Sequence, residues 1–267
     1  MSDKQTVSLL GKVLVRADLG AVTGLRIGGS SEGLKIGGVD ARVIRDPWDR
    51  PYIPGSSLKG KLRSLLERHL KVRVEIGQGK VAEHYCTSAA DYANCPVCRM
   101  FGTTEQLDTM TLTRLQVRDT YLDEASVKAL PSAEVTLSEV KTEIMIDRRT
   151  GTTGGRGAGG LRQIERVPAG AVFRPVELVL NLYDDEDKAL LRHLFVAMEL
   201  LEDDYLGGMG SRGYGKVKFE NVKVWWNTAA DYETGQVDTG QKPPVNGEMD
   251  TPVKLVQGFE TLKARLV

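Results

Sequence analysis

The apolar pattern of residues 176–219 constrains the fold most, because its period changes twice within one short stretch. Apolar side chains alternate with others from Val176 to Leu182, which is typical of a half-buried strand. From residue 190 onward the apolar positions follow a helical repeat, which places on one face Leu190, Leu194, Met198 and Leu201. Acidic residues at positions 184, 185 and 187 suit the N-terminus of that helix, and strand alternation resumes at residues 215–219. The pattern therefore predicts a strand–helix–strand unit.

A similar unit is predicted near the start of the chain. The apolar run Val13–Val15 indicates a strand, and a helix follows later, with Ser56 or Ser57 as its natural N-cap. The apolar stripe of this helix consists of Leu58, Leu62, Leu65 and Leu66. Two such halves with long insertions between them favour an α+β fold of the modified ferredoxin-like type.

The overall properties are those of an ordinary soluble protein. Among 267 residues, 36 basic side chains balance 36 acidic ones, so the net charge gives no evidence for a nucleic-acid partner. The sequence has no stretch of about 18 apolar residues and no charged leader, which predicts a cytoplasmic protein with no membrane partner. Residues 227–249 are polar and rich in Gly, Pro and Thr, so we expect a linker there. A last helix is predicted from Thr251, with one side formed by Val253, Val256, Phe259 and Leu262.

All three cysteines lie in one short window beside a histidine, as His84, Cys86, Cys95 and Cys98. An odd number of clustered cysteines argues against a secreted disulfide framework. Thiolates and imidazole fill a closed tetrahedral zinc shell, and C-x-x-C spacing places two sulfurs on one ion. The alternative is three inert, small apolar side chains beside a surface histidine. We predict a structural zinc site.

Two glycine-containing segments carry cations that suit a phosphate backbone. Residues 55–63 combine a helix N-terminus with Lys59, Lys61 and Arg63, although a solvated helix face explains these cations as well. Residues 207–215 contain a literal G-x-G-x-x-G, but this loop follows a helix and opens a strand, the reverse of a dinucleotide-binding fingerprint. The loop predicts either a phosphate-binding loop with Arg212 as clamp or a tight helix-to-strand connection.

A third basic segment extends from Lys141 to Arg166. It holds six glycines between residues 151 and 160, and its arginines are at positions 148, 149, 156, 162 and 166. This composition is too charged and too flexible for a core. It predicts a mobile arm that orders on nucleic acid, or a solvated hairpin tip.

Few side chains are candidates for acid–base or nucleophilic catalysis. No Ser-His-Asp or Cys-His arrangement stands out, and His69 and His193 lie in predicted helices as structural residues. Asp40 is the carboxylate with the most suggestive setting, because glycines flank its loop and Arg42 and Arg45 are near by. On these grounds alone, a plain loop aspartate remains the alternative.

Together these segments resemble blocks of the repeat-associated RAMP superfamily, and most closely the CRISPR type III-A backbone subunit that repeats along a guide RNA. The matching blocks stand in family order at residues 27–31, 40–47, 52–63, 146–151, 165–170 and 206–215. The resemblance covers about residues 10–225, and the region after Trp226 lies outside it.

The resemblance implies a modified ferredoxin-like, RNA-recognition-motif palm over residues 1–226. Two insertions are implied in this palm, a zinc-binding one at about residues 77–110 and a glycine/arginine-rich thumb at about residues 120–166. Residues 227–267 would form a C-terminal linker and helix. In this family each thumb displaces one guide–target base pair. The implied partners are guide (CRISPR) RNA, target RNA, other copies of the chain or paralogous RAMP subunits, and other effector-complex subunits.

The resemblance also implies roles for individual residues. Asp40 matches the aspartate associated with magnesium- or manganese-dependent cutting of target RNA beside each displaced pair. The positions expected to contact RNA are Arg26, Gly28, Gly29, Ser56, Ser57, Lys59, Lys61, Arg63, Arg148, Arg162, Arg166, Gly208 and Arg212. A structural guide-holding subunit without nuclease activity is the alternative.

Overall fold

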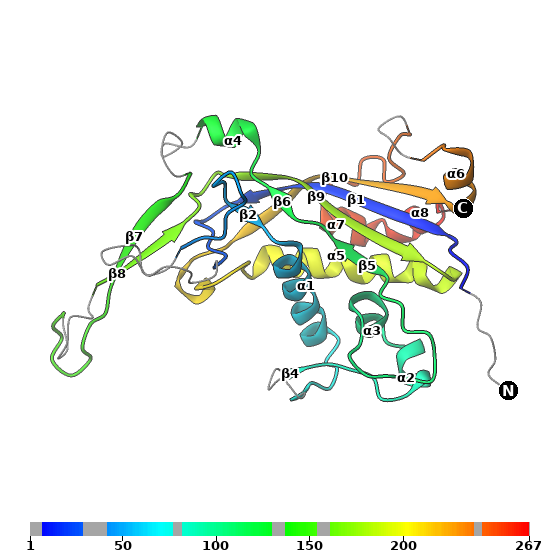
Figure 1. The fold of residues 1–267 in the computed structure, drawn as a ribbon, viewed down its shortest axis with the longest axis horizontal. Coiled ribbons are helices and arrows are strands. Elements are labelled where there is room, and N and C mark those ends of the chain that lie inside the picture. The colour runs from blue at the N-terminus through cyan, green and yellow to red at the C-terminus, as the bar shows by residue number, and fades with distance from the viewer. Residues whose placement is uncertain are drawn as a thin grey trace.

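A four-stranded antiparallel sheet forms the centre of the protein, with strand order β10-β1-β9-β5 (Figure 1). The computed structural model describes residues 7–28, 42–76, 82–129, 137–153, 161–237 and 242–266. Strand β1 (Gly11–Ala21) lies between β9 (Val172–Leu182) and β10 (Val217–Thr228), and β5 (Leu115–Val117) pairs with β9. Buried and less buried residues alternate along β1, so this strand turns one face toward the core.

Two long helices cover one face of this sheet (Figure 1). They are α1 (Gly55–His69) and α5 (Leu190–Asp203), which pack against each other. Every leucine of the predicted stripe in residues 58–66 is buried, and so are the four predicted positions of α5. The 3-10 helix η1 (Asp185–Ala189) precedes α5, with acidic residues in its first turn. The helical periods predicted from the sequence are therefore confirmed.

The start of α1 differs from the prediction. The N-cap is Pro54, and the helix begins at Gly55, so Ser56 and Ser57 lie inside the first turn and the predicted serine cap is wrong. The Gly55 N–H donates instead to Asp119 Oδ1 at 2.7 Å. A Cβ atom at Gly55 would lie 2.2 Å from the Val117 carbonyl oxygen, so glycine lets the helix start this close to its neighbour.

Short elements connect these parts. Strand β2 (Tyr52–Ile53) pairs with β6 (Thr120–Tyr121), and β3 (Glu75–Ile76) pairs with β4 (Ala82–Glu83). Short helices in the described residues include α2 (Ala89–Ala93), α3 (Pro96–Phe101), α4 (Glu124–Ala129) and the 3-10 helix η2 (Gly210–Arg212).

A two-stranded hairpin projects from the body of the protein (Figure 1). It consists of β7 (Glu139–Ile144) and β8 (Leu161–Arg166), within the segment predicted to form a thumb. Several apolar side chains on and next to this hairpin are more than half exposed, namely Val140, Ile144, Met145, Ile146 and Leu161. The prediction made for Arg156 and the glycines around it lies outside the described residues. The apolar side chains of the hairpin are therefore available for contacts outside the chain.

The C-terminal segment packs onto the sheet and α5. It contains α6 (Ala229–Thr234), α7 (Pro252–Gln257) and α8 (Phe259–Lys263). Leu255 and Phe259 are buried, but Val253 is exposed, so the predicted apolar face is wrong at that position. At the outer edge of β10, Asn246 Oδ1 accepts a hydrogen bond from the Val224 N–H, and Asn246 Nδ2 donates to the Val222 carbonyl oxygen. Among the described residues, no helix is long and apolar enough to cross a membrane.

Candidate nucleic-acid interface and metal centre

Two glycine-containing loops meet at Arg26. The Gly208 N–H donates to the Arg26 carbonyl oxygen at 2.9 Å, and the Gly215 N–H donates to the Gly24 carbonyl oxygen at 3.0 Å. A Cβ atom at Gly207, which has a φ of +77°, would lie 2.2 Å from the Arg26 carbonyl oxygen. The loop before β10 therefore packs directly on the segment after β1, and only glycine permits this approach.

The side chain of Arg26 is a cation with an unused donor. Its Nε is buried and, among the described residues, has no hydrogen-bond partner. A Cβ atom at Gly28 would lie 3.6 Å from the Arg26 guanidinium, and one at Gly208 would lie 3.2 Å from it, so two glycine backbones flank this side chain. Because a buried N–H without a partner is costly, this arrangement suits an anionic oxygen supplied by a ligand. The structure thus brings together three of the predicted RNA-contacting positions.

The loop that carries Asp40, including Gly29, lies outside the described residues, but its stem is described. Gly28 pairs with Val43, and the Ile44 N–H donates to the Ile27 carbonyl oxygen at 2.9 Å. The stem is a short two-stranded ribbon that starts next to Arg26. Asp40 therefore belongs to a loop whose two ends are held at the Arg26 site.

Glu165 anchors this stem to the base of the hairpin. Its carboxylate accepts hydrogen bonds from Val43 N at 2.9 Å, Arg45 Nη2 at 2.6 Å and Ser138 Oγ at 2.6 Å. Burial alone would raise the pKa of Glu165, but the bonds from Ser138, Arg45 and Val43 outweigh it and lower the pKa. Sequence reasoning gave Glu165 no role, although it lies in one of the quoted blocks, because its partners are distant along the chain.

The cations of α1 have different surroundings. Lys61 Nζ lies 3.2 Å from Asp204 Oδ2 and 3.8 Å from the centre of the Tyr205 ring. Arg63 pairs with Glu67 and donates to the His84 carbonyl oxygen. Lys61 thus connects α1 to the segment after α5, and Arg63 connects it to the loop after β4. Lys59 has no such partner among the described residues, and burial, followed by the charge of Arg63, lowers its pKa.

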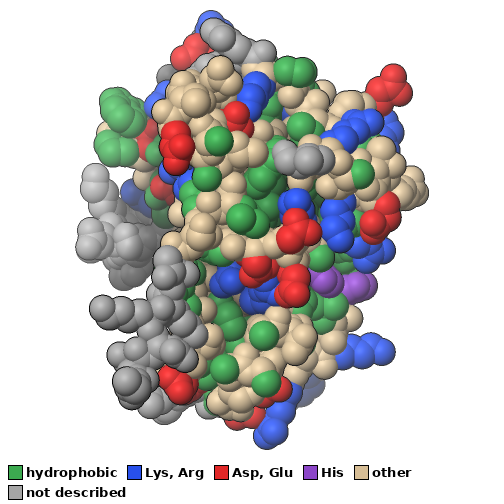
Figure 2. All heavy atoms as spheres, turned by 90° about the vertical axis from the view of Figure 1, so that its right-hand side faces the viewer, with side chains coloured by type: hydrophobic (Ala, Val, Ile, Leu, Met, Phe, Trp, Pro, Cys, Tyr) green, Lys and Arg blue, Asp and Glu red, His purple; other side chains and the backbone are tan. Residues whose placement is uncertain are grey.

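Arginines from the hairpin segment and from η2 line one cavity. Arg148, Arg162 and Arg212 line a cavity of ≈530 Å³ whose other lining residues are Glu143, Ile144, Met145 and Ile146. Arg212 pairs with Glu143 at 3.2 Å. Arg166 instead pairs with Glu139 at 2.6 Å and lies over the Tyr214 ring. On the face shown in Figure 2, at the end of the protein away from the hairpin, basic and acidic side chains are interspersed.

The four predicted metal ligands come together. The ligand atoms of His84, Cys86, Cys95 and Cys98 all lie within 4.8 Å of one another, and the three thiols are buried. The loop after β4 supplies the first two ligands, and the start of α3 supplies the others. His84 Nδ1 lies 2.7 Å from the Arg73 carbonyl oxygen, which leaves Nε2 to face the sulfurs. Three sulfurs and one imidazole nitrogen form a closed donor set of the kind that suits structural zinc.

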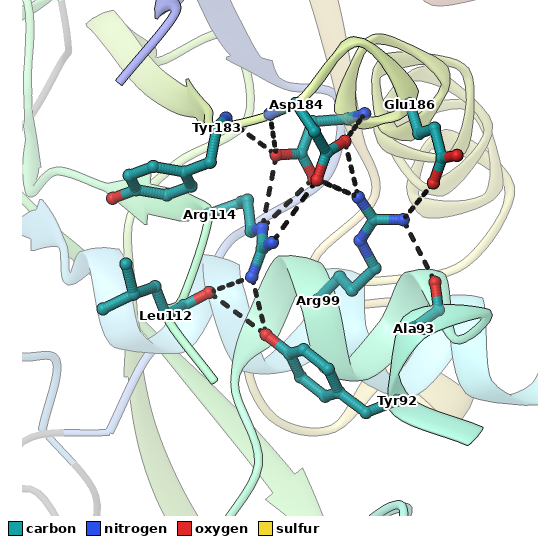
Figure 3. Close-up of polar contacts among 9 residues, drawn as sticks. Tyr92, Ala93, Arg99, Leu112, Arg114, Tyr183, Asp184 and Glu186 are labelled. Atoms are coloured by element: carbon teal, nitrogen blue, oxygen red, sulfur yellow. Dashed lines mark hydrogen bonds and ion pairs between the residues drawn. The ribbon is translucent and has the colours of Figure 1, made fainter. Parts of the chain in front are cut away.

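A buried ion network links the metal cluster to the segment between β9 and α5 (Figure 3). Arg99 in α3 and Arg114 before β5 both donate to Asp187 Oδ1, at 2.7 Å and 3.1 Å. The Asp187 side chain is fully buried, and its Oδ2 accepts the backbone N–H of Tyr183 at 2.9 Å. Asp184 pairs with Arg99 as well. Sequence reasoning missed this network, because nothing in the local pattern relates Arg99 to residues more than 80 positions away.

Comparison with known proteins decides the family. The model of the RAMP superfamily matches residues 18–218. The chain belongs to the RAMP superfamily. The resemblance stated from the sequence is thereby confirmed.

Relatives of this RAMP chain share one name. The "CRISPR system Cms endoribonuclease Csm3" of Methanocaldococcus jannaschii is 43% identical over 229 residues, which are 86% of this chain and 87% of that protein. The protein of the same name from Mycobacterium tuberculosis is 38% identical over 227 residues, covering 80% of this chain and 88% of that protein.

Solved structures agree with this placement. A Csm3–Csm4 subcomplex of a type III-A CRISPR-Cas interference complex matches with a TM-score of 0.57 and 28% identity, covering 95% of this chain and 97% of that one. Csm3 of Methanopyrus kandleri matches with a TM-score of 0.66 at 21% identity, covering 97% and 99%, and supports the fold alone. The mixed α/β RAMP fold follows from both.

Proposed function

We propose that this RAMP chain is a backbone subunit of a type III CRISPR ribonucleoprotein that holds guide RNA and cuts complementary target RNA at regular intervals. The relatives named as endoribonucleases support the activity. The observation that carries the proposal is the stem of the Asp40 loop, which Glu165 ties to the base of the thumb. In this proposal, the thumb that displaces a base pair and the stem of the loop that cuts beside it share one junction.

Guide RNA would bind at the junction of the two glycine loops. Arg26 offers an unused, buried N–H there, and Gly28 and Gly208 let a phosphate approach the backbone. The other proposed RNA contacts remain those predicted from the sequence, namely Gly29, Ser56, Ser57, Lys59, Lys61, Arg63, Arg148, Arg162, Arg166 and Arg212. Lys61 and Arg63 would have to exchange an internal partner for a phosphate.

Asp40 is the proposed catalytic residue. Its carboxylate would hold a magnesium or manganese ion, which stabilises charge at the scissile phosphate, or orient the attacking RNA 2′-hydroxyl. The described stem residues would position this loop. After the loop, Val43 and Arg45 hydrogen-bond to Glu165, and before it, Gly28 pairs with Val43.

The finer architecture is also a proposal. The strand order and the two helices on one face support a ferredoxin-like, RNA-recognition-motif palm over residues 1–226. The Cys/His cluster supports a zinc-binding insertion at about residues 77–110, and the hairpin supports a thumb at about residues 120–166. Residues 227–267 remain the proposed C-terminal extension.

Reconstitution with guide RNA and partner subunits tests the function. With Mg²⁺ or Mn²⁺, the wild-type complex should cut a complementary RNA at evenly spaced positions. Asp40→Ala should keep guide and target binding but reduce cleavage by orders of magnitude at every position, because each copy carries the same lesion. Asp185→Ala, at an exposed aspartate of η1, is the matched control. Equal cleavage by the Asp40→Ala complex would exclude Asp40, and a wild-type complex that never cuts would favour a structural subunit.

A further inference from the structure

One carboxylate of the hairpin lies among cations. Glu143 belongs to β7, in the hairpin that projects from the body of the protein (Figure 1). It lines the ≈530 Å³ cavity together with arginines 148, 162 and 212, and it is the acid among the described residues that line this cavity. Three guanidinium groups and one carboxylate leave the cavity positively charged. An anionic ligand is therefore attracted to it even while Glu143 is in place.

Glu143 does not bind the arginine opposite it on the hairpin. It faces Arg162 in the register of β7 and β8, but among the described residues these two side chains form no ion pair. Glu143 Oε2 instead accepts a hydrogen bond from Arg212 Nη1 at 3.2 Å, and Oε1 accepts one from the Tyr214 hydroxyl at 2.9 Å. Both donors belong to the glycine-containing loop before β10. The carboxylate thus connects the hairpin to that loop.

The two donors are groups that a phosphate would use. Guanidinium and hydroxyl groups commonly donate to phosphate oxygens, and carboxylate oxygens accept the same hydrogen bonds. Arg212 is one of the positions proposed to contact guide RNA. In the chain alone, the Glu143 carboxylate therefore takes the place that a phosphate would take at Arg212.

Replacing this carboxylate by a phosphate costs little. The Arg212 side chain is 54% exposed, so water screens its pair with Glu143. When Arg212 turns to a phosphate, Glu143 retains the Tyr214 hydroxyl, and Lys141 Nζ lies 4.0 Å from its Oε1. The exchange therefore leaves no buried charge without a partner, which is the costly case.

We propose that Glu143 is an internal competitor of RNA, which occupies Arg212 until a backbone phosphate of the guide RNA displaces it. This competition lowers the affinity for every phosphate ligand of Arg212. Ligands with further contacts, such as an RNA strand that is also held at Arg26, still bind. The inference rests on the proposed function and describes the regulation of its RNA site. In the opposite role, Glu143 would hold Arg212 ready for RNA, and removing its charge would weaken binding.

The sign of the effect of Glu143→Gln separates these roles. Glutamine still offers an acceptor to the Tyr214 hydroxyl but carries no charge. Fluorescence anisotropy measures binding of a labelled single-stranded oligouridylate to the full chain over a salt series. Glu143→Gln should tighten binding about two- to fivefold, the effect of removing a competing exposed ion pair. It should also make the slope of log K for RNA binding against log salt concentration steeper by up to about 0.7.

A matched control removes the same charge elsewhere. Asp250→Asn changes an exposed aspartate that pairs with Lys254 in the C-terminal segment, so this variant should bind RNA like wild type. Unchanged or weaker RNA binding by Glu143→Gln would overturn the proposal.

A double-mutant cycle tests whether the competition acts through Arg212. Arg212→Gln should weaken RNA binding, and adding Glu143→Gln to it should then tighten binding far less than in the wild-type background, because the contested cation is gone. An equal gain in both backgrounds would show a general charge effect and refute the proposal.

The inference and the proposed function fail in different ways. Oligouridylate binding requires neither a guide sequence nor partner subunits, so an unaltered affinity of Glu143→Gln refutes the inference even where a reconstituted complex cuts RNA. Tighter binding by the variant, together with a reconstituted complex that holds no guide RNA, would refute the proposed function alone. If wild type and variant bind no RNA at all, both are refuted.

Discussion

Replacing Asp187 by asparagine should destabilise the protein strongly. The Asp187 side chain is fully buried and accepts hydrogen bonds from both Arg99 and Arg114. Asparagine keeps the shape but removes the charge that neutralises two largely buried guanidinium groups. Breaking a buried ion pair in this way costs about 3–5 kcal/mol. Asp184 stays beside Arg99, so we expect the lower end, about 3 kcal/mol.

Thermal unfolding of the metal-loaded full chain measures this effect. For a domain of this size, each kcal/mol shifts Tm by roughly 2–4 °C, so Asp187→Asn should lower Tm by roughly 6–12 °C. The control is Asp185→Asn, because Asp185 is exposed and its ion pair with Lys188 is screened by water, so its loss should change the stability little. Equal Tm values for the two variants would refute the reasoning.

A double-mutant cycle separates the network from general damage. Arg99→Met removes one of the stranded charges, so combining it with Asp187→Asn should cost less than the sum of the two single changes. Strict additivity would mean that Arg99 and Asp187 do not stabilise each other.

Three further outcomes follow from the structure. Arg26→Ala should weaken the binding of guide RNAs of unrelated sequence equally. It should also reduce the slope of log K for guide binding against log salt concentration by about 0.7–0.9. A change in base preference would contradict a phosphate contact. Elemental analysis of the purified chain should find about one zinc per molecule, and Cys95→Ser should release the zinc and lower Tm. Wild-type protein without bound metal would contradict this prediction. Burial would raise the pKa of Glu165, but hydrogen bonds from Ser138, Arg45 and Val43 hold the pKa below that of an ordinary glutamate. Its ionised form therefore stabilises the fold at pH values above the ordinary glutamate pKa, and this contribution is lost as pH falls through the lowered pKa. Glu165→Gln should therefore flatten the acid limb of the stability–pH profile measured by chemical denaturation, and an unchanged limb would contradict this role.

What the sequence predicted correctly rests on local periodicity. The apolar repeats of α1 and α5 need only neighbouring residues to be visible. The strand at residues 176–182 was visible in the same way, but its predicted half-buried alternation is wrong, because residues 178–182 of β9 are all buried. The metal cluster was also visible, because its four ligands lie within fifteen residues. These features do not depend on how distant segments meet.

What the sequence did not show depends on contacts between distant residues. The serine cap of α1 failed because Asp119, 64 positions from Gly55, supplies the acceptor. The partner of Lys61 is Asp204, and that of Arg45 is Glu165, each more than 100 positions away. The sequence does not show the ion-pair partner of a charged side chain when that partner is distant along the chain. Counting Lys and Arg in the sequence therefore overestimates the cations available to RNA.

The segment from Gly24 to Gly28 explains why the proposed activities occur at one place. Its backbone accepts hydrogen bonds from the loop before β10 at Gly24 and Arg26, pairs with Val167 at the base of the thumb through Leu25, and pairs with Val43 in the Asp40 stem through Gly28. A guide phosphate at Arg26 would therefore touch the same short segment that pairs with the base of the hairpin and with the stem of the Asp40 loop. Because these attachments are backbone hydrogen bonds, the distance from Arg26 to the described stem of the Asp40 loop is set by the fold and repeats in every copy. In the proposed function, even spacing of the cuts then requires only even spacing of the copies along the guide RNA.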